Sequence, residues 1–329
     1  MSERLQLVFF GSDAIALPLL DSLALPGSAG AEIVAVFTQP DRPTGRGQKI
    51  QPNAIKAWAL ARALPVFQPE KLTPDVQAQL ASLGADLGLV MAYGHILRDA
   101  FIATPRLGML NLHTSLLPRF RGASPIQSAT ASGEQETGVT LMRIVRKLDA
   151  GPIAAVERVR IEPLDTAIEV EAKLAAASVP LVAGVLPRLA EGKVDFIPQD
   201  ETAATYCRKL AKDDSAVDFA TEARLLAARI NGLFPWPACS VEVGGQVVKI
   251  GLADSVESEA TDAKVPAGEV VGADEHGLRV ATSRGILRLR KLQRAGGRML
   301  PTAEFLRGFP IEQGTVLPSL PMTTLVTTR

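Results

Sequence analysis

The pattern of apolar and polar residues differs between the first and the later part of the chain. In the first part, short apolar runs alternate with stretches in which apolar residues recur at helical spacing. The predicted strands are 5–10, 32–38, 65–68, 86–92 and 107–115. The predicted helices are 14–25, 54–64, 74–84 and 95–105. Repeated strand–helix units of this length predict a mainly parallel sheet covered by helices, and such sheets bind ligands at the carboxyl ends of their strands.

The pattern of apolar residues changes after residue 137. Two strands are predicted at 137–145 and 152–162, followed by a long helix at 166–192 and an amphipathic helix at 221–232. Beyond Pro237, short β-like runs are broken by glycines, and the Gly-Gly pair at 244–245 predicts a hairpin turn. Several short strands at close spacing are typical of a small barrel, of which the OB type is one form.

These patterns predict an α/β protein with two domains. We place a Rossmann-like domain with a mainly parallel sheet in residues 1–191 and a linker in residues 192–208. We place a smaller OB-like β-barrel domain in residues 209–329.

Composition narrows the choice of partner and compartment. The 329 residues contain 35 Lys and Arg and 35 Asp and Glu, so any polyanionic partner must bind a local cluster of basic residues. Cys207 and Cys239 have no metal-ligand spacing and fit a reduced, intracellular chain. We find neither a signal peptide nor an apolar run long enough to span a bilayer. We therefore expect a cytoplasmic protein without a membrane partner.

Several motifs of common enzyme classes are absent. Gly11, after the first predicted strand, does not begin a G-x-G-x-x-G sequence, so a dinucleotide site is not predicted. The chain also lacks a phosphate-binding P-loop, a zinc-ligand spacing and a G-x-S-x-G elbow. The sequence therefore predicts chemistry without a metal.

Asn111 and His113 are the first candidates for chemistry. They lie two residues apart at the end of a predicted strand, so they share one face while Leu112 points to the other. An amide and an imidazole at the carboxyl end of a parallel sheet can stabilise the oxyanion that forms when a carbonyl is attacked. The alternative is a structural pair that ends the strand.

Asp149 is a third candidate, in the loop RKLDAG between two predicted strands. It contributes to catalysis only if it folds back towards His113, which spacing cannot establish. The alternative is a solvated turn aspartate, held by neighbouring basic residues.

Two basic regions are candidates for binding nucleic acid. The loop at 38–52 contains Arg42, Arg46 and Lys49 among prolines and glycines, which exclude a helix or an inner strand. Between Arg279 and Arg298 the chain has no acidic residue, and Arg288 and Arg290 share one strand face. Ordinary surface charge is the alternative for both regions.

The segments NLHTSLLPRFRGASPIQ and TGVTLMRIVRKLDAGPI resemble the 10-formyltetrahydrofolate-dependent formyltransferases. The segments VFTQPDRPTGRGQKIQP, PVFQPEKL, QDETAATYCRKL and INGLFPWPACSVEV are similar to the branch of that family that formylates methionyl-initiator tRNA. The resemblance runs over nearly the whole chain.

This resemblance implies a formyltransferase catalytic domain over 1–191 and a tRNA-binding OB-like domain over 209–329. It implies 10-formyltetrahydrofolate as co-substrate, methionyl-initiator tRNA as partner and a monomer. The implied catalytic residues are Asn111, His113 and Asp149. The implied folate-contacting residues are Ser115, Leu116, Leu117 and Pro118. The implied tRNA-contacting residues are Arg42, Arg46, Lys49, Arg208, Lys209, Arg288 and Arg290.

Three other functions remain open at this point. A formyltransferase that acts on an amino-sugar nucleotide would share the catalytic trio but would not need the basic loop. A formyltetrahydrofolate hydrolase would keep the trio and release formate. A non-catalytic RNA-binding protein on the same scaffold would not need the trio at all.

Overall fold

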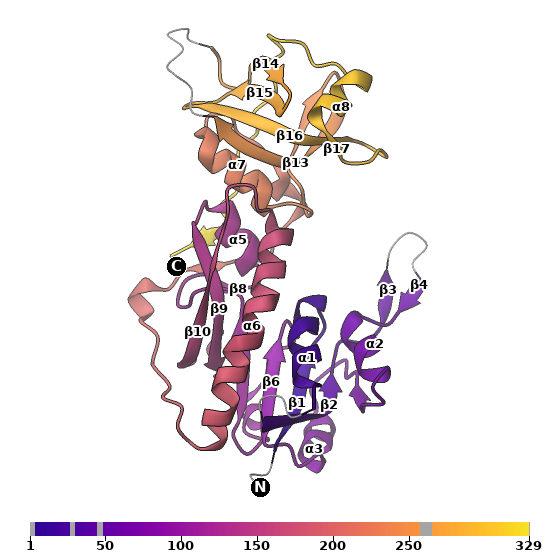
Figure 1. Ribbon diagram of the computed structural model, residues 1–329, viewed down its shortest axis with the longest axis vertical. Coiled ribbons are helices and arrows are strands. Elements are labelled where there is room, and N and C mark those ends of the chain that lie inside the picture. Colours follow the sequence, from indigo (N-terminus) through magenta and orange to yellow (C-terminus); the bar gives the residue numbers. More distant parts are fainter. Residues whose placement is uncertain (1–3, 27–29, 45–48, 257–264, 329) are drawn as a thin grey trace. The chain divides into compact units, whose positions relative to one another are not determined.

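The computed structural model describes residues 4–26, 30–44, 49–256 and 265–328 (Figure 1). The chain forms two compact units, each built from several stretches of sequence. Unit 1 comprises Met1–Arg121, Gly138–Val159 and Glu171–Ala204. Unit 2 comprises Gly122–Thr137, Arg160–Val170 and Thr205–Arg329. The division at a linker over residues 192–208 stays a prediction.

A seven-stranded sheet forms the centre of unit 1. Its strands in spatial order are β10 (Ile153–Arg160), β9 (Glu136–Arg143), β7 (Met109–His113), β6 (Leu87–Met91), β1 (Leu5–Gly11), β2 (Ala31–Phe37) and β5 (Val66–Phe67). From β5 to β7 neighbouring strands run parallel, whereas β9 is antiparallel to β7. The mainly parallel sheet predicted from the sequence is confirmed.

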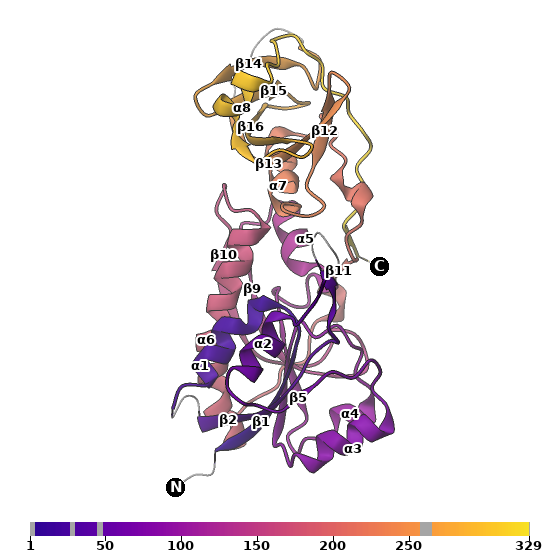
Figure 2. The ribbon, with the colours of Figure 1, turned by 90° about the vertical axis from the view of Figure 1, so that its right-hand side faces the viewer.

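Helices cover both faces of this sheet. They are α1 (Leu17–Leu23), which follows the 3-10 turn η1 (Ala14–Ala16), α2 (Ala54–Leu60), α3 (Pro74–Ser82), α4 (Asp99–Ile102) and α6 (Ala167–Ala190). Figure 2 shows α3 and α4 on one face and α1 and α6 on the other. Asn53 and Thr73 cap α2 and α3 by accepting hydrogen bonds from backbone amides. Pro74 stands at the first helical position of α3, as the start signal predicts.

The helix predicted at 95–105 is wrong in length, because α4 covers only Asp99–Ile102. Arg98, directly before α4, has an extended backbone, and Gly94 has a left-handed φ of 84°. At the other end stands Pro105, and a proline disfavours helical geometry in the residue before it. Local backbone geometry therefore shortens the helix although the apolar spacing continues.

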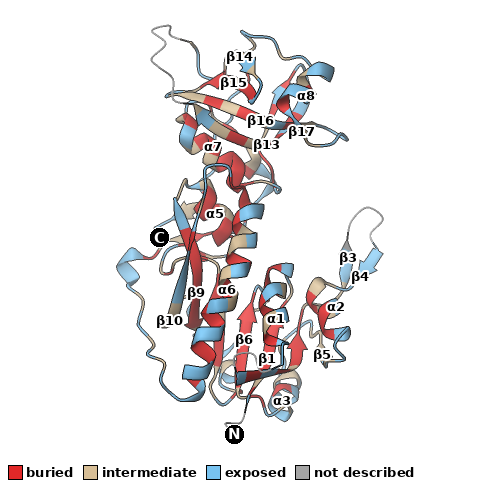
Figure 3. Cartoon of the chain, in the orientation of Figure 1, coloured by how far each residue is buried: buried red, intermediate tan, exposed pale blue. Residues whose placement is uncertain are grey.

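The inner strands β1, β6 and β7 are buried on both faces, as a covered parallel sheet requires, whereas the edge strand β10 is largely exposed (Figure 3). One face packs aromatic rings between the strands and α4. Phe10 stacks on Phe37 with ring centroids 4.9 Å apart, and Phe37 stacks on Phe67 at 4.7 Å. Phe101 of α4 meets Phe10 edge-on. This aromatic stack fixes the relative position of β1, β2 and β5, the three strands at one edge of the sheet.

The long helix α6 contains Pro180 and Pro187, as predicted. By length and composition alone α6 could cross a membrane. An 18-residue stretch of it has a mean hydropathy of 1.4, and 44% of that stretch is buried inside the protein. A core helix has the same properties. By length and composition, the expectation that no apolar run is long enough to span a bilayer is therefore wrong, and the absence of a membrane partner stays a prediction.

Unit 2 contains an antiparallel sheet. Its strands in spatial order are β12 (Ser240–Val243), β13 (Gln246–Val256), β16 (Ile286–Arg294), β15 (Gly277–Ala281) and β14 (Val270–Asp274), and β17 (Leu300–Pro301) pairs with β16. Gly244 and Gly245 join β12 to β13 with positive φ angles of 55° and 75°, which confirms the predicted hairpin. The antiparallel β domain is confirmed, and its closure into an OB-like barrel stays a prediction.

Smaller elements complete unit 2. The helices are α5 (Pro125–Ala131), α7 (Ala223–Gly232) and α8 (Thr302–Gly308). A three-stranded sheet contains β18 (Val326–Thr327), β11 (Tyr206–Cys207) and β8 (Arg121–Gly122). Asn231 of α7 makes two hydrogen bonds of 2.9 Å with the backbone of Ala253 in β13. The helix is therefore fixed to the sheet by polar contacts as well as by packing.

Asp214 connects two parts of the last stretch of unit 2, its start near Arg208 and the C-terminal segment near Thr323. Its carboxylate accepts hydrogen bonds from Arg208, from the backbone amide of Ala211 and from the Thr323 hydroxyl. Arg208 in turn donates to the carbonyl oxygen of Thr324 at 3.0 Å. The hydrogen bonds from Arg208 are the main reason why the pKa of Asp214 is well below its usual range.

We expect Asp214→Asn to lower the free energy of unfolding at pH 7 by about 3 kcal/mol, because it breaks a buried, charge-assisted network. A lowered folded-state pKa stabilises the fold fully above the unfolded value of about 3.9, and this stabilisation is lost progressively as pH falls from there through the folded-state pKa. The gap between wild type and variant should therefore be full at pH 7 and narrow below about pH 4. Urea unfolding at several pH values measures this gap. Asp213→Asn, at the exposed neighbouring position, is the control, and an equal effect there would contradict the role of Asp214.

Candidate active site

Asn111 and His113 lie at the carboxyl end of β7, between two neighbouring strands. Asn111 pairs in register with Val90 of β6 and Met142 of β9, and His113 pairs with Thr140 of β9. The intervening Leu112 is buried. Because side chains alternate along a strand, the amide and the imidazole share one face, as the sequence predicts.

The imidazole of His113 is anchored by one of its nitrogens. Nε2 lies 2.8 Å from the carbonyl oxygen of Phe120, and His113 is 6% exposed. A carbonyl oxygen can only accept, so Nε2 carries the hydrogen and donates it. In the neutral ring, Nδ1 is then a free proton acceptor. Because Nε2 is held in this way, Nδ1 is the ring nitrogen that can take up and release a proton.

Asp149 does fold back to this imidazole. Its carboxylate oxygen Oδ2 lies 3.7 Å from Nδ1 of His113, and its side chain is 10% exposed. The residue adopts a left-handed φ of 50°, which is unusual for a side chain other than glycine. The loop between β9 and β10 thus brings together two groups that are distant in sequence.

Gly151 lets this loop close on itself. A Cβ atom at this position would stand 1.8 Å from the carbonyl oxygen of Arg143. The close approach is fixed by a hydrogen bond of 3.0 Å from the Arg143 amide to the carbonyl oxygen of Pro152. Any side chain at 151 would push the two ends of the loop apart and move Asp149.

Asn111 has a carboxamide that no residue in the described part of the chain hydrogen-bonds. The residue is half-buried, and its side chain lies on the same face of β7 as that of His113. An amide donor, a ring nitrogen and a carboxylate therefore converge at the end of β7. This set can bind a developing oxyanion and move a proton.

The segment from Ser115 to Pro118 is fixed by hydrogen bonds rather than left free. Ser115 is buried and its hydroxyl donates to the carbonyl oxygen of Arg119 at 2.6 Å. Thr140 donates to the carbonyl oxygen of Ser115 at 2.6 Å and accepts from the amide of Leu117 at 3.2 Å. Leu117 is also buried, which leaves Leu116 and Pro118 partly exposed for contact with a ligand. Contact of these residues with folate stays a prediction.

The basic loop at 38–52 forms a small antiparallel ribbon of β3 (Arg42–Thr44) and β4 (Lys49–Gln51). Arg42 and Lys49 are exposed, and neither makes an ion pair with another residue that the structure describes. Arg46 lies outside the described residues. Cations without an internal partner remain available to an anionic ligand.

The root of this ribbon is held firmly. Asp41 accepts a hydrogen bond of 2.5 Å from Lys56 and one of 2.8 Å from Gln68. These bonds, the one from Lys56 above all, lower the pKa of the Asp41 carboxyl. The ribbon of β3 and β4 therefore begins next to a residue, Asp41, that is held in place by hydrogen bonds.

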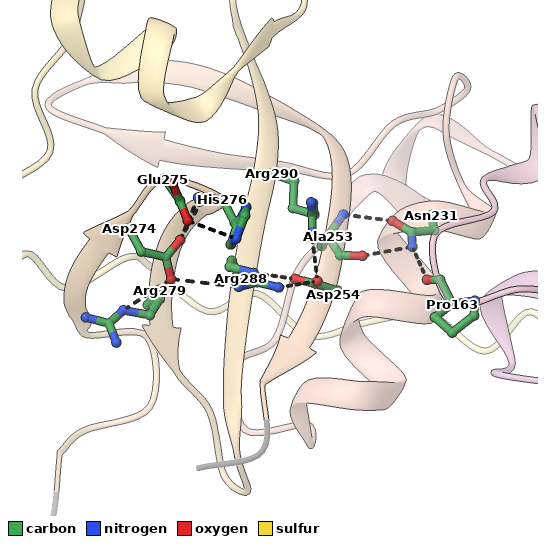
Figure 4. Close-up of polar contacts among 11 residues, drawn as sticks. Pro163, Asn231, Ala253, Asp254, Asp274, Glu275, His276, Arg279, Arg288 and Arg290 are labelled. Carbon is green, nitrogen blue, oxygen red and sulfur yellow. Dashed lines mark hydrogen bonds and ion pairs between the residues drawn. The ribbon is translucent and has the colours of Figure 1, made fainter.

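The remaining predicted tRNA contacts differ in their availability. The Arg208 guanidinium is committed to Asp214, whereas Lys209 is exposed. Figure 4 shows Arg288 and Arg290 converging on Asp254, with distances of 2.6 Å and 2.8 Å to the same carboxylate oxygen. The two arginines share a strand face as predicted, and both also stabilise the fold of unit 2. Their contact with tRNA stays a prediction.

Sequence reasoning missed Arg121, the largest fully buried side chain of the structure, and Gln199, which Arg121 contacts. Their partners come from distant parts of the chain, so no local spacing indicates them. The only hint is an arginine directly before a glycine in a loop rich in turn formers. Within the described residues, no three His, Cys, Asp or Glu side chains gather to hold a metal.

Comparison with known proteins places both units in one family. Residues 5–186 match the formyl transferase domain, and residues 209–310 match the formyl transferase C-terminal domain. The methionyl-tRNA formyltransferase of Sorangium cellulosum is 40% identical over 94% of this chain and 98% of its own length. That of Pseudomonas entomophila is 42% identical over 90% of this chain and 93% of its own length.

A solved structure has the same fold at much lower identity. It is an N-formyltransferase from Helicobacter canadensis in complex with folinic acid and dTDP-3-aminofucose. The TM-score is 0.64 at 16% identity, over 88% of this chain and 99% of that one. At this identity the likeness extends to the fold alone.

We expect neutral His113 to carry its hydrogen on Nε2, because that nitrogen donates to the Phe120 carbonyl oxygen. Nitrogen-15 NMR of the imidazole distinguishes the two tautomers directly. In the neutral ring, Nε2 should give the resonance of a protonated nitrogen and Nδ1 that of an unprotonated one. His95, whose Nε2 has no hydrogen-bond partner among the described residues, should show no such fixed preference and is the control. A neutral His113 with its hydrogen on Nδ1 would contradict the assignment.

Proposed function

We propose, since this chain belongs to the formyl transferase family, that it transfers the formyl group of 10-formyltetrahydrofolate to the free α-amino group of methionyl-initiator tRNA. The observation that carries this function is an identity of 40% or more to methionyl-tRNA formyltransferases over both units. The sugar-nucleotide acceptor is represented by solved structures at 16% identity, where the likeness extends to the fold alone, so it is not favoured. The acceptor takes part in translation, so we place the activity in the cytoplasm, and we expect a monomer.

Asn111 binds the oxyanion in this proposal. When the amine attacks the formyl carbon, the formyl oxygen gains negative charge, and a preorganised amide donor stabilises that charge. The carboxamide is suited to this role because the described part of the chain offers it no other hydrogen-bond partner. Its position on a strand, between two neighbouring strands, limits its movement.

His113 and Asp149 handle the protons. The amine nitrogen must lose one proton as the new C–N bond forms, and N10 of the folate must gain one as the old C–N bond breaks, so no net proton is consumed. Nδ1 of His113 and the Asp149 carboxylate, 3.7 Å apart, form a pair that can hold this proton in between. The distance exceeds a direct hydrogen bond, and a bridging water or a small closing movement spans it.

The anchored tautomer changes the role that the sequence suggests for His113. A neutral ring with its Nε2 hydrogen on Phe120 has no hydrogen left to donate to the oxyanion. It can donate from Nδ1 only after it has taken up a proton. His113 is therefore a proton carrier first and an oxyanion donor second, whereas Asn111 is a donor throughout.

The direct test is incubation of the full chain with 10-formyltetrahydrofolate and three acceptors: methionyl-initiator tRNA, methionyl-elongator tRNA and an amino-sugar nucleotide. We expect formylation of the initiator, little of the elongator and none of the sugar. Asn111→Ala should lower kcat by about 10²–10³-fold through loss of one oxyanion donor. Formate release without an acceptor would favour a hydrolase, and formylation of the sugar alone would overturn the proposal.

The exposed ribbon cations contact the tRNA backbone in this proposal. We expect Arg42→Ala and Lys49→Ala to raise KM for tRNA and leave KM for the folate donor unchanged. Each should reduce the slope of log affinity against log salt by about one, the effect of one phosphate contact. Lys71→Ala removes an exposed charge elsewhere in unit 1 and is the matched control. Equal losses for donor and tRNA would contradict a role in tRNA binding alone.

A further inference from the structure

We propose that Gln199 is a positioning residue, which holds the loop of Asp149 in its catalytic conformation and is itself held by buried Arg121. This inference rests on the proposed function, because it concerns the carboxylate that moves the proton. All the residues involved belong to unit 1.

Gln199 holds the loop at Asp149 and again two residues later, at Gly151. Its Nε2 donates to the carbonyl oxygen of Asp149 at 2.9 Å and to that of Gly151 at 2.8 Å. A carboxamide nitrogen has two hydrogens, so both are used on this loop. No other amino acid of this length supplies two neutral donors from one atom together with an acceptor. The clamp acts where the Asp149 backbone has a left-handed φ, a conformation that needs support from its surroundings.

The acceptor end of Gln199 is fixed by Arg121. The carboxamide oxygen accepts hydrogen bonds of 2.7 Å and 3.1 Å from the Arg121 guanidinium, which is completely buried. Since the oxygen faces the guanidinium, the nitrogen must face the loop. Arg121 thus decides which way the amide of Gln199 points.

Glu201 completes the arrangement two residues further on. Its carboxylate accepts from Arg121 at 3.1 Å and from Lys147 at 2.6 Å, so it joins the guanidinium to the same loop. These bonds, that from Arg121 first, lower the pKa of Glu201 to about 2, and the carboxylate stays charged at neutral pH. The loop is therefore held at Lys147, at Asp149 and at Gly151.

The segment that carries Gln199 is aligned by backbone contacts. Ile197 and Ile153 exchange two hydrogen bonds, of 2.8 Å and 2.9 Å, in an isolated β-bridge. This bridge sets the register between the segment and β10, just after the loop. Gln199 then stands two residues beyond the bridge, opposite the loop that it clamps.

The test is Gln199→Glu in the full chain. A glutamate keeps the length and still pairs with Arg121, but it cannot donate to the two loop carbonyls. We expect kcat to fall roughly 10–100-fold, as a small displacement of a catalytic group does. KM for the folate donor and for tRNA should each stay within about threefold, because both binding surfaces remain. Gln77→Glu is the matched control: it too loses a bond from Nε2 to a backbone carbonyl, at a half-buried position of α3.

A readout independent of turnover separates this inference from the proposed function. The nitrogen-15 resonance of His113 Nδ1, at fixed pH, reports whether the Asp149 carboxylate is close. In Gln199→Glu it should move in the same direction as in Asp149→Asn. If the wild type does not formylate tRNA but the resonance moves, the proposed function fails and the positioning role stands.

Two results would overturn the positioning role. One is an unchanged kcat with an unchanged Nδ1 resonance. The other is a loss of kcat that parallels a loss of folded protein, again with an unchanged resonance in the folded fraction. If Gln199→Glu does not fold, Gln199→Met preserves the length and removes the donors without a charge, and the same two readouts decide.

Discussion

The hydrogen bond between the His113 ring and the Phe120 carbonyl oxygen is the contact on which the site depends. It fixes the orientation of the imidazole and reserves Nδ1 for the proton. The bond requires the chain to turn back sharply after Pro118, and Phe120 adopts a left-handed φ of 58° to make that turn. The loop after β7 therefore prepares the histidine as well as shaping the surface for a ligand.

Strained backbone and tight packing occur together in this region. Phe120 and Asp149 both have left-handed φ angles, and each carries an atom that contacts or faces His113. Such conformations persist only where the surroundings over-determine them. Here Thr140 fixes one loop from β9, and Gln199 fixes the other from the segment after α6. The geometry of the His113–Asp149 pair thus depends on hydrogen bonds from several segments that are distant in the sequence.

The sequence predicts much of this protein because its signals are local. Strand-helix alternation predicts the parallel sheet, the Gly244-Gly245 pair predicts its hairpin, and strand periodicity places Asn111 beside His113. Spacing could not establish the approach of Asp149 to His113, since that depends on loop closure at Gly151. It could not indicate the pairing of Arg288 and Arg290 with Asp254, nor the burial of Arg121. These features arise from tertiary contacts between residues far apart in the chain.

The pairing around Asp254 has an electrostatic consequence for the arginine face of unit 2. Three arginines, Arg279, Arg288 and Arg290, face two carboxylates, Asp254 and Asp274, so three positive and two negative charges leave a net charge of one. The number of counterions released from a bound nucleic acid follows the number of its phosphates that such a face neutralises, and the two carboxylates lower that number. The arginine-rich strand β16 can therefore attract a nucleic acid only weakly, because nearby carboxylates neutralise most of its positive charge.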